Sequence, residues 1–161
     1  MTAHDIVIHE ADAATIAAAL SSFLGDAGAT AALLIDRSGQ PLVTAGPSRT
    51  LDTASIAALA AGAFSSTGAL ARLLGETEFS VLFHQGVKEN MHVSTVDEQA
   101  ILLVIFNDQT TVGMVRLFAR ETTRAVAAIL AAARTRPRKT GGLAVPMTAD
   151  EIRPAFRGRP A

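Results

Sequence analysis

Three short apolar segments at close spacing place the tightest limit on how this chain folds. They cover residues 79–84, 91–96 and 101–106, and the short connections between them contain the turn-like residues 87–90 and 97–99. Connections this short leave no room for a crossover, so consecutive strands must lie side by side and run antiparallel. The chain is therefore predicted to contain a three-stranded antiparallel meander.

Helical periodicity surrounds this meander. Apolar residues recur at helical spacing over residues 12–24, 51–74 and 111–134. Gly25 and Gly75 follow the first two of these segments, and glycine is the residue that most often ends a helix. We therefore predict three helices, two before the last strand and one after it.

Two further strands complete the predicted fold. Residues 30–36 and 41–45 are apolar, and the turn between them contains Gly39, as hairpin turns often do. The resulting order is α-β-β-α-β-β-β-α. This order predicts an α+β domain in which helices pack on a five-stranded antiparallel sheet.

Basic residues gather at the end of the chain. Residues 1–133 carry seven Lys or Arg and thirteen Asp or Glu, whereas residues 134–161 carry seven and two. The stretch 135–145 mixes basic residues with Pro and Gly, a composition typical of linkers. We therefore expect a domain over residues 1–134, followed over residues 135–161 by a basic linker and a short C-terminal segment.

Several classes of protein are disfavoured by composition. The absence of cysteine excludes disulfides, thiolate chemistry and Cys-based zinc sites. Only 4% of residues are aromatic, with no Trp or Tyr, which argues against a base-stacking platform for nucleic acid. We see neither a signal peptide nor an uncharged apolar run of about 18 residues. A soluble cytoplasmic protein, with no nucleic-acid partner and no membrane insertion, is expected.

No catalytic constellation is apparent. Phosphate-binding, dinucleotide-binding, nucleophile-elbow and zinc-protease motifs are all missing. His4 and His9 lie near the start of the chain. His84 and His92 flank one predicted hairpin and offer two metal ligands, but no third ligand has an obvious place. We therefore expect a protein that is not an enzyme and that holds no cofactor or metal.

The helix over residues 51–74 has an unusual composition. It is rich in alanine and contains Gly62 and Gly68, although a glycine inside a helix costs about 1 kcal/mol relative to alanine. An alanine-biased genome is the plain explanation, and close approach of another backbone is the functional one. Its large apolar residues are expected to form the buried face: Ile56, Leu59, Phe64, Leu70, Leu73 and Leu74.

A shallow stripe on the same helix is the candidate docking surface. Ala61, Ser65, Ala69 and Arg72 recur at spacings of three and four residues, so they share one side of the helix. A helix that is buried on one side and nearly flat on the other suits contact with another macromolecule. We therefore predict that this stripe binds a protein partner.

The first strand of the meander predicts a dimer. One of its sides lacks a partner within the meander, and an exposed apolar strand would invite aggregation. Pairing with the same strand of a second copy removes this hazard and gives an isologous dimer. We expect Gly62, Phe79, Val81 and Phe83 to lie at that interface.

The element order and several segments resemble the roadblock (dynein light chain type) family. The resemblance extends from about residue 10 to residue 134 and is greatest toward bacterial members that regulate polarity and gliding. The segments that carry it are residues 33–39 (LLIDRSG), 51–62 (LDTASIAALAAG), 68–79 (GALARLLGETEF), 83–86 (FHQG) and 103–116 (LVIFNDQTTVGMVR).

This resemblance implies a function. It implies a homodimer that binds a Ras-like small GTPase of the MglA type and stabilises the hydrolysis-competent arrangement of its switch regions, without inserting an arginine. The tail departs from the family because the family's tail is acidic and this one is basic. By the resemblance, the partner-binding residues are Ala61, Ser65, Ala69 and Arg72 on the helix and Ile152 and Phe156 in the tail.

Other functions stay open at this point. Many roadblock domains are scaffolds that bind a GTPase without changing its turnover. Arg72 lies on the proposed docking face, and an inserted arginine accelerates GTP hydrolysis by roughly 10³–10⁵. A small-molecule sensor between sheet and helix is a third possibility, although no polar constellation in the sequence indicates one.

Overall fold

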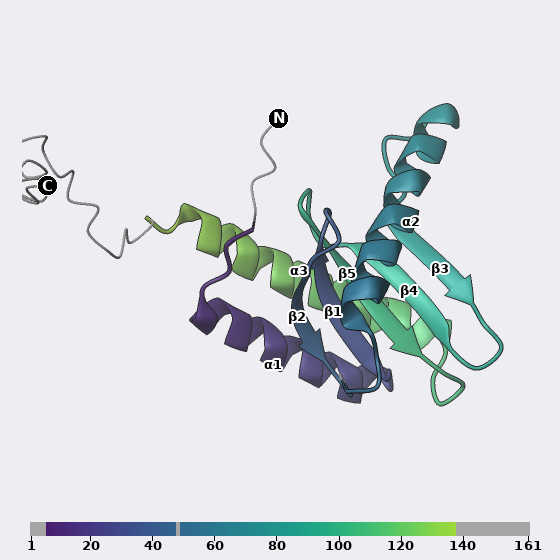
Figure 1. The fold of residues 1–161 in the computed structure, drawn as a ribbon, viewed down its shortest axis with the longest axis horizontal. Coiled ribbons are helices and arrows are strands. Elements are labelled where there is room, and N and C mark those ends of the chain that lie inside the picture. Colours follow the sequence, from purple (N-terminus) through teal and green to yellow (C-terminus); the bar gives the residue numbers. More distant parts are fainter. Residues whose placement is uncertain (1–5, 48, 138–161) are drawn as a thin grey trace, which may run out of the picture.

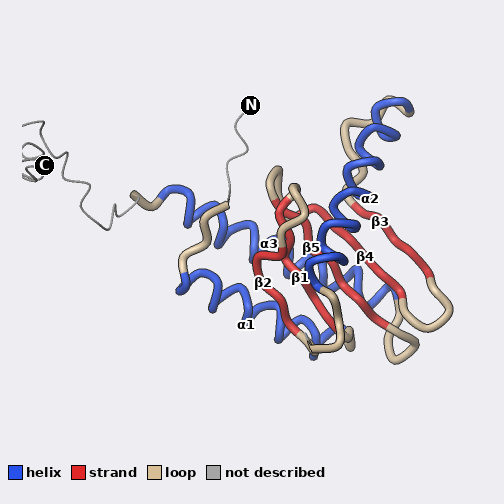
Figure 2. Tube along the Cα trace, viewed as in Figure 1, coloured by secondary structure: helices blue, strands red, loops and turns tan. Residues whose placement is uncertain are grey.

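The computed structural model describes residues 6–47 and 49–137 and confirms the predicted order of elements. Figure 1 and Figure 2 show how these elements are arranged. Each helix and strand begins and ends within three residues of its predicted bounds. The elements are α1 (Glu10–Ala27), β1 (Ala31–Asp36), β2 (Pro41–Ala45), α2 (Thr53–Leu73), β3 (Val81–Gln85), β4 (Asn90–Thr95), β5 (Ala100–Phe106) and α3 (Val112–Thr135).

The sheet has five antiparallel strands in the order β2-β1-β5-β4-β3. The predicted meander forms its second half, and β1 joins it by pairing with β5. β1 and β5 are central and almost entirely buried, which explains their continuous apolar sequences. β3 lies at one edge of the sheet, so one of its sides is unpaired.

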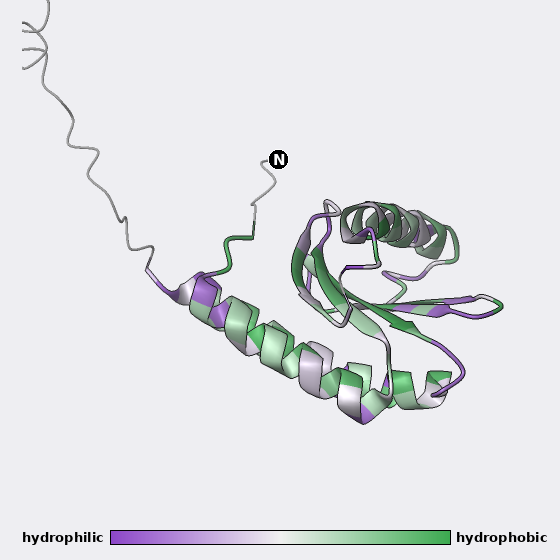
Figure 3. Ribbon diagram, turned by 60° about the horizontal axis from the view of Figure 1, so that its bottom comes forward, coloured by the Kyte–Doolittle hydropathy of each residue, from purple (hydrophilic) through white to green (hydrophobic). Residues whose placement is uncertain are grey.

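Helices cover both faces of the sheet. α1 and α3 pack side by side on one face and α2 lies on the other, as the edge-on view in Figure 3 shows. Alternate residues of β1 serve the two faces: Leu34 packs in the cluster with α1 and α3, and Leu33 packs in the cluster with α2. The protein therefore has three layers and a core on each side of the sheet.

The predicted domain boundary falls at the end of α3. Arg136, just past α3, forms an ion pair with Asp12 of α1 at 2.9 Å, and Asp12 is buried. This contact joins the residue after α3 to α1. The C-terminal segment expected within residues 135–161 lies, from residue 138 onward, outside the described residues.

The turn between β1 and β2 positions α2. Gly39 is buried in this turn with a φ of 97°, a conformation that L side chains rarely adopt. A Cβ atom at this position would lie 2.9 Å from the Cα atom of Ala58 in α2. The turn therefore touches the backbone of α2, and only glycine fits between them.

We predict that Gly39→Ala lowers the free energy of unfolding by about 1–3 kcal/mol, because alanine is strained at this φ and collides with α2. Urea denaturation measures the change. Gly25→Ala is the matched control, since a Cβ there meets no atom within 4 Å and α1 gains a better helix former. Equal stabilities of the two variants would contradict this role for Gly39.

Candidate functional site

Helix α2 packs on the sheet mainly through small residues. Its buried residues are Ala57, Ala60, Ala61, Phe64 and Ala71. Alanine lets the helix backbone approach the strands closely, and Phe64 fills the space between α2 and the cluster of β1, β4 and β5 residues beneath it. Ile56 is partly buried against the same cluster, and the opposite side of the helix is free of the sheet.

The predicted buried face of α2 is wrong for four leucines. Leu59, Leu70, Leu73 and Leu74 are 75%, 52%, 83% and 67% exposed. At 100° per residue, Leu59 and Leu70 lie on the opposite side of the helix from Phe64. Leu73 and Leu74 lie at the C-terminal end of α2, which extends beyond the strands (Figure 1). The large apolar residues therefore face outward.

Helix α2 departs from the expectation that the chain contains no apolar run long enough to cross a membrane. By length and composition alone, Thr53–Leu73 is apolar enough to cross a membrane. In this fold the apolar character has two sources, alanines against the sheet and leucines on the outside. A helix with one apolar face on its own sheet and another exposed is a candidate for contact with a protein.

Strand β3 adds a free sheet edge to this part of the molecule. Val81 and Phe83 are 38% and 39% exposed, and their side chains lie on the α3 face of the sheet, because they pair with Ser94 and His92. We call the four outward leucines of α2 and the free backbone edge of β3 together the α2–β3 surface. Such large exposed apolar patches mark interaction sites on soluble proteins. The surface combines a helix face with a sheet edge, as a protein interface requires.

The free edge of β3 presents unpaired backbone groups. The N–H of Thr95 donates to the C=O of Ser80. Hydrogen-bonded and non-hydrogen-bonded pairs alternate along an antiparallel ladder, so this bond shows which β3 residues are bonded to β4. Leu82 and His84 therefore exchange hydrogen bonds with β4, whereas the N–H and C=O groups of Val81 and Phe83 point away from it. β3 is ready to pair with another strand.

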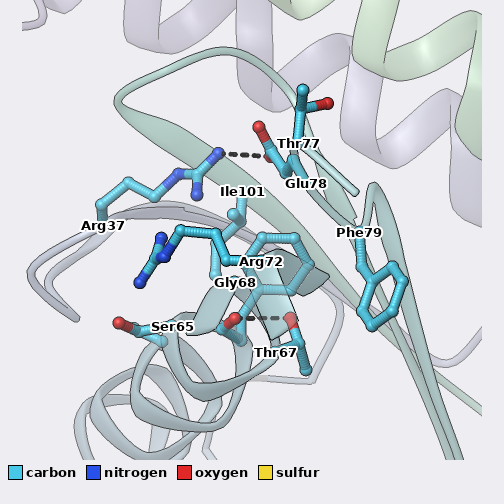
Figure 4. A pocket seen from close by; sticks show the side chains of 11 residues that line it. Arg37, Ser65, Thr67, Gly68, Arg72, Thr77, Glu78, Phe79 and Ile101 are labelled. Atoms are coloured by element: carbon cyan, nitrogen blue, oxygen red, sulfur yellow. Dashed lines mark hydrogen bonds and ion pairs between the residues drawn. The ribbon is translucent and has the colours of Figure 1, made fainter. Parts of the chain in front are cut away.

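A groove of about 260 Å³ lies beside the second half of α2 (Figure 4). Ser65, Gly68 and Arg72 line it from the helix, and Phe79 lines it from the loop that leads into β3. In Figure 4, Arg72 and Ser65 lie at the end of the groove away from Phe79. Several residues predicted from the sequence are thus brought together here.

Arg37 closes one side of this groove. Its guanidinium lies 5.3 Å from the ring centroid of Phe64 and donates to a Glu78 carboxylate oxygen at 3.1 Å. It also donates to the backbone C=O of Asp97 at 3.2 Å. The ion pair between Arg37 and Glu78 holds the loop between α2 and β3 against the β1–β2 turn.

Glu78 is ionised in this arrangement. The hydroxyl of Thr95 donates to its carboxylate at 2.8 Å and lowers the pKa of Glu78, and Arg37 lowers it further, while partial burial opposes both.

Arg72 differs from Arg37, because within residues 6–47 and 49–137 it forms no ion pair. Its charge is available to a partner.

The predicted partner-binding residues are divided by the structure. Ser65, Ala69 and Arg72 are exposed along one flank of α2. The prediction for Ala61 is wrong, because Ala61 is 5% exposed and packs on the sheet. Each four-residue step turns the helix by about 40°, so the stripe rotates from the buried side at residue 61 to the surface at residue 65. Ile152 and Phe156 lie outside the described residues.

The predicted dimer residues lie around the α2–β3 surface. Gly62 is exposed, and a Cβ atom built on it would meet nothing within 4 Å. Val81 and Phe83 lie in β3. Phe79 is partly buried and comes before the strand, which begins at Val81 rather than at residue 79.

The two hairpin histidines do not converge. His92 pairs with Phe83 and shares its face of the sheet, whereas His84 pairs with Met91 and points to the other face. His92 is buried and His84 is exposed. In the part of the chain that the structure describes, no group of three or more His, Asp or Glu residues is placed to hold a metal ion.

Sequence analysis missed Arg37 and Glu78, which are 41 residues apart, because no local pattern links them. The outward leucines had a signal. Buried alanines and Phe64 recur at helical spacing across α2, and this spacing indicates its buried side. The prediction instead assumed that the largest apolar residues are buried, which placed the leucines inward.

Fold and surface together define a roadblock domain. The Roadblock/LC7 domain model matches residues 15–106, which is more than half of the chain and runs from α1 through β5. The chain belongs to the Roadblock/LC7 family, whose members are regulatory or adaptor proteins. No curated protein sequence matches the chain significantly.

Among solved structures the chain is similar to MglB. MglB of Myxococcus xanthus is 34% identical with a TM-score of 0.73, and the alignment covers 78% of this chain and 95% of MglB. The gliding protein MglB of Thermus thermophilus is 31% identical with a TM-score of 0.75, covering 80% and 97%. A Roadblock/LC7 domain from Streptomyces avermitilis, 17% identical over 71% of this chain and 97% of that one, shares the fold with a TM-score of 0.65.

We predict that Thr95→Val raises the pKa of Glu78 toward its ordinary value, and by more than Arg37→Met does. The reason is that the Thr95 hydroxyl is the largest cause of the lowered pKa. NMR titration of the glutamate side-chain carboxyls measures the shift. Because folding lowers this pKa, the contribution of Glu78 to stability is present above its unfolded pKa and is lost as the pH falls.

Thr15→Val is the control for the Thr95 variant. The Thr15 hydroxyl donates to the C=O of Ala11 on exposed α1, far from Glu78 in the fold. Removing it leaves the Glu78 titration unchanged. An unchanged titration in Thr95→Val as well would contradict the hydrogen-bonded arrangement of this groove.

Proposed function

We propose that this protein is a GTPase-activating regulator of a Ras-like small GTPase of the MglA type. It acts in bacterial polarity or gliding motility, in the cytoplasm. It works as a homodimer that stabilises the hydrolysis-competent switch conformation of its partner and supplies no catalytic residue of its own. The observation that carries the proposal is the outer face of α2, where a smooth flank adjoins the α2–β3 surface in a chain at least 31% identical to MglB proteins.

Dimerisation is supported by the two parts of the α2–β3 surface. Antiparallel pairing of β3 with its copy satisfies the outward N–H and C=O groups of Val81 and Phe83 and extends the sheet across the two-fold axis. The same axis brings the outward leucines of two α2 helices toward each other. A related MglB structure, 31% identical, is described as having a tetrameric arrangement, so self-association occurs among these proteins.

The GTPase is proposed to bind the flank of α2 that carries Ser65, Ala69 and Arg72. Ser65 and Ala69 are short, so the backbone of a partner can approach the helix closely. Binding the competent switch arrangement more tightly than the other arrangements raises its population, and a shift from 1:99 to 99:1 requires a preference of roughly 10⁴. The residues of the GTPase then carry out the hydrolysis.

Arg72 is assigned a contact at the edge of this site. It projects from the flank of a regular helix beside Ser65, next to the groove (Figure 4). An arginine finger must reach the transferred phosphate, and a finger contributes roughly 10³–10⁵ in rate. A contact at the edge contributes to affinity instead.

We predict that Val81→Pro abolishes self-association without unfolding the protomer. The N–H of Val81 points away from β4, so proline removes no hydrogen bond within the sheet but blocks a strand on the free edge. Sedimentation velocity at micromolar concentration is expected to show a monomer with a native circular dichroism spectrum.

Val81→Thr is the matched control, because threonine keeps the N–H and suits a strand. It is expected to remain a dimer. If Val81→Pro dimerises as tightly as the parent, β3 is not at the interface, and a monomeric parent protein would refute the dimer itself.

We predict that the double variant Ser65→Arg with Ala69→Arg loses GTPase binding and the stimulation of GTP turnover while it stays dimeric. Two long charged side chains on the smooth flank prevent close approach. The measurement is single-turnover GTP hydrolysis by the cognate GTPase with each variant. Ala14→Arg with Ala18→Arg is the matched control, since both residues are exposed on α1 at the same spacing, on the opposite face of the sheet.

Arg72→Ala separates the two mechanisms in the same assay. A contact at the edge predicts a loss of less than about tenfold at saturating protein, whereas a finger predicts a loss of roughly 10³ or more. Binding without any change in turnover would favour the scaffold function. Absence of binding would reject both functions.

A further inference from the structure

A second groove lies on the other face of the sheet, under α3. Its volume is about 520 Å³, and it is bounded by the first half of α3 and by the β3–β4 edge of the sheet. This face is opposite α2 (Figure 3), so the groove is separate from the proposed GTPase-binding flank. The volume falls in the range of roughly 300–1,000 Å³ that is usual for small-molecule sites.

Two polar side chains at the floor of this groove lack hydrogen-bond partners. His92 is 1% exposed and Ser94 is 7% exposed, and both are on β4 facing α3. Neither ring nitrogen of His92 nor the hydroxyl of Ser94 has a partner among the described residues. An unsatisfied buried polar group costs stability, so such a group in a native protein marks a place where a water, an ion or another bound molecule can satisfy it.

The wall of the groove carries two available positive charges. Arg116 and Arg120 are one turn apart on the flank of α3 that lines the groove. Among residues 6–47 and 49–137, neither forms an ion pair or a side-chain hydrogen bond. Guanidinium groups match the geometry of phosphate and carboxylate oxygens, so this wall favours an anionic group.

The floor of the groove favours an uncharged part of a ligand, in contrast to the positively charged wall. Burial and, to a smaller extent, the charge of Arg116 lower the pKa of His92 to about 4, so the imidazole is neutral at neutral pH. A neutral imidazole has one donor and one acceptor, and the Ser94 hydroxyl offers both. Val81 and Leu117 add apolar contacts at the sides. Hydroxyl groups are the simplest partners for such a floor.

We propose that this groove binds a small hydroxylated organic anion. Its phosphate or carboxylate lies between Arg116 and Arg120, and its hydroxyl groups hydrogen-bond to His92 and Ser94. Binding here adds a small-molecule input to the face of the sheet opposite the protein-binding surface. The site does not depend on the proposed GTPase function.

NMR titration of the full-length protein tests this proposal with three probes. Ribose 5-phosphate and gluconate present a hydroxylated phosphate and a hydroxylated carboxylate, and ribose lacks the anionic group. At least one of the anions is expected to shift the amide resonances of β4 and the first half of α3, together with the ring nitrogens of His92. Ribose is expected to cause no shift, and the stronger anion identifies the anionic group.

Variants assign the binding to these residues. Arg116→Gln and Arg120→Gln are each expected to weaken binding about tenfold or more. Arg124→Gln, on an exposed position of α3 outside the groove, leaves it unchanged. His92→Leu is expected to abolish binding while the melting temperature of the free protein stays the same or rises, because an unsatisfied polar group is removed from the interior.

His84→Leu is the control for His92→Leu, since His84 is exposed on the other face of the same hairpin. The proposal is overturned if neither anion binds more tightly than about 10 mM, if ribose binds as well as the anions, or if binding survives in the double variant Arg116→Gln with Arg120→Gln. A large fall in melting temperature in His92→Leu would also overturn it, because His92 would then be satisfied by the fold alone.

Discussion

The close packing of α2 on the sheet is the contact on which the other features of this surface depend. Ala57, Ala60 and Ala61 let the helix approach the strands, and the Gly39 turn meets the helix backbone directly. With these small residues inward, helical geometry places the leucines outward. The apolar outer surface is therefore a consequence of how α2 packs, and this protomer's own sheet does not cover it.

The order of the strands supplies the other part of the α2–β3 surface, the free edge of β3. Because β1 inserts beside β5, the meander ends in an unpaired strand, β3, and the loop from α2 delivers the chain to it. Arg37 and Glu78 fasten this loop, so the helix flank and the sheet edge keep a fixed relation to each other. A fixed surface of apolar side chains and unpaired backbone groups suits pairing with a second copy, and the smooth flank beside it suits a different partner.

Sequence patterns predicted the fold far better than the surface. Strand periodicity and short connections are local signals, and they predicted the order of the elements and their bounds within three residues. The predicted stop at Gly25 was wrong, because α1 continues through Gly25 and ends at Ala27, before Gly28 with its φ of 67°. The buried side of α2 depends on which residues meet the sheet, and a residue-size rule chose leucine where the structure uses alanine. The contact of Arg37 with Glu78 joins distant segments, and so does the groove that Arg116 and Arg120 line together with His92 and Ser94. Ser65, Ala69 and Arg72 were placed correctly on the exposed flank because they lie within one helix.

The central claim is that another copy of the chain covers the free edge of β3, and residue-resolved amide hydrogen exchange tests it most directly. The amide N–H groups of Leu82 and His84 donate to β4 within the protomer and are protected from exchange in any state. The amide N–H groups of Val81 and Phe83 point away from β4. Pairing between copies predicts that Val81 and Phe83 are protected nearly as strongly as Leu82 and His84 at micromolar concentration, and that they lose protection on dilution. Rapid exchange of Val81 and Phe83 at every concentration would contradict the account.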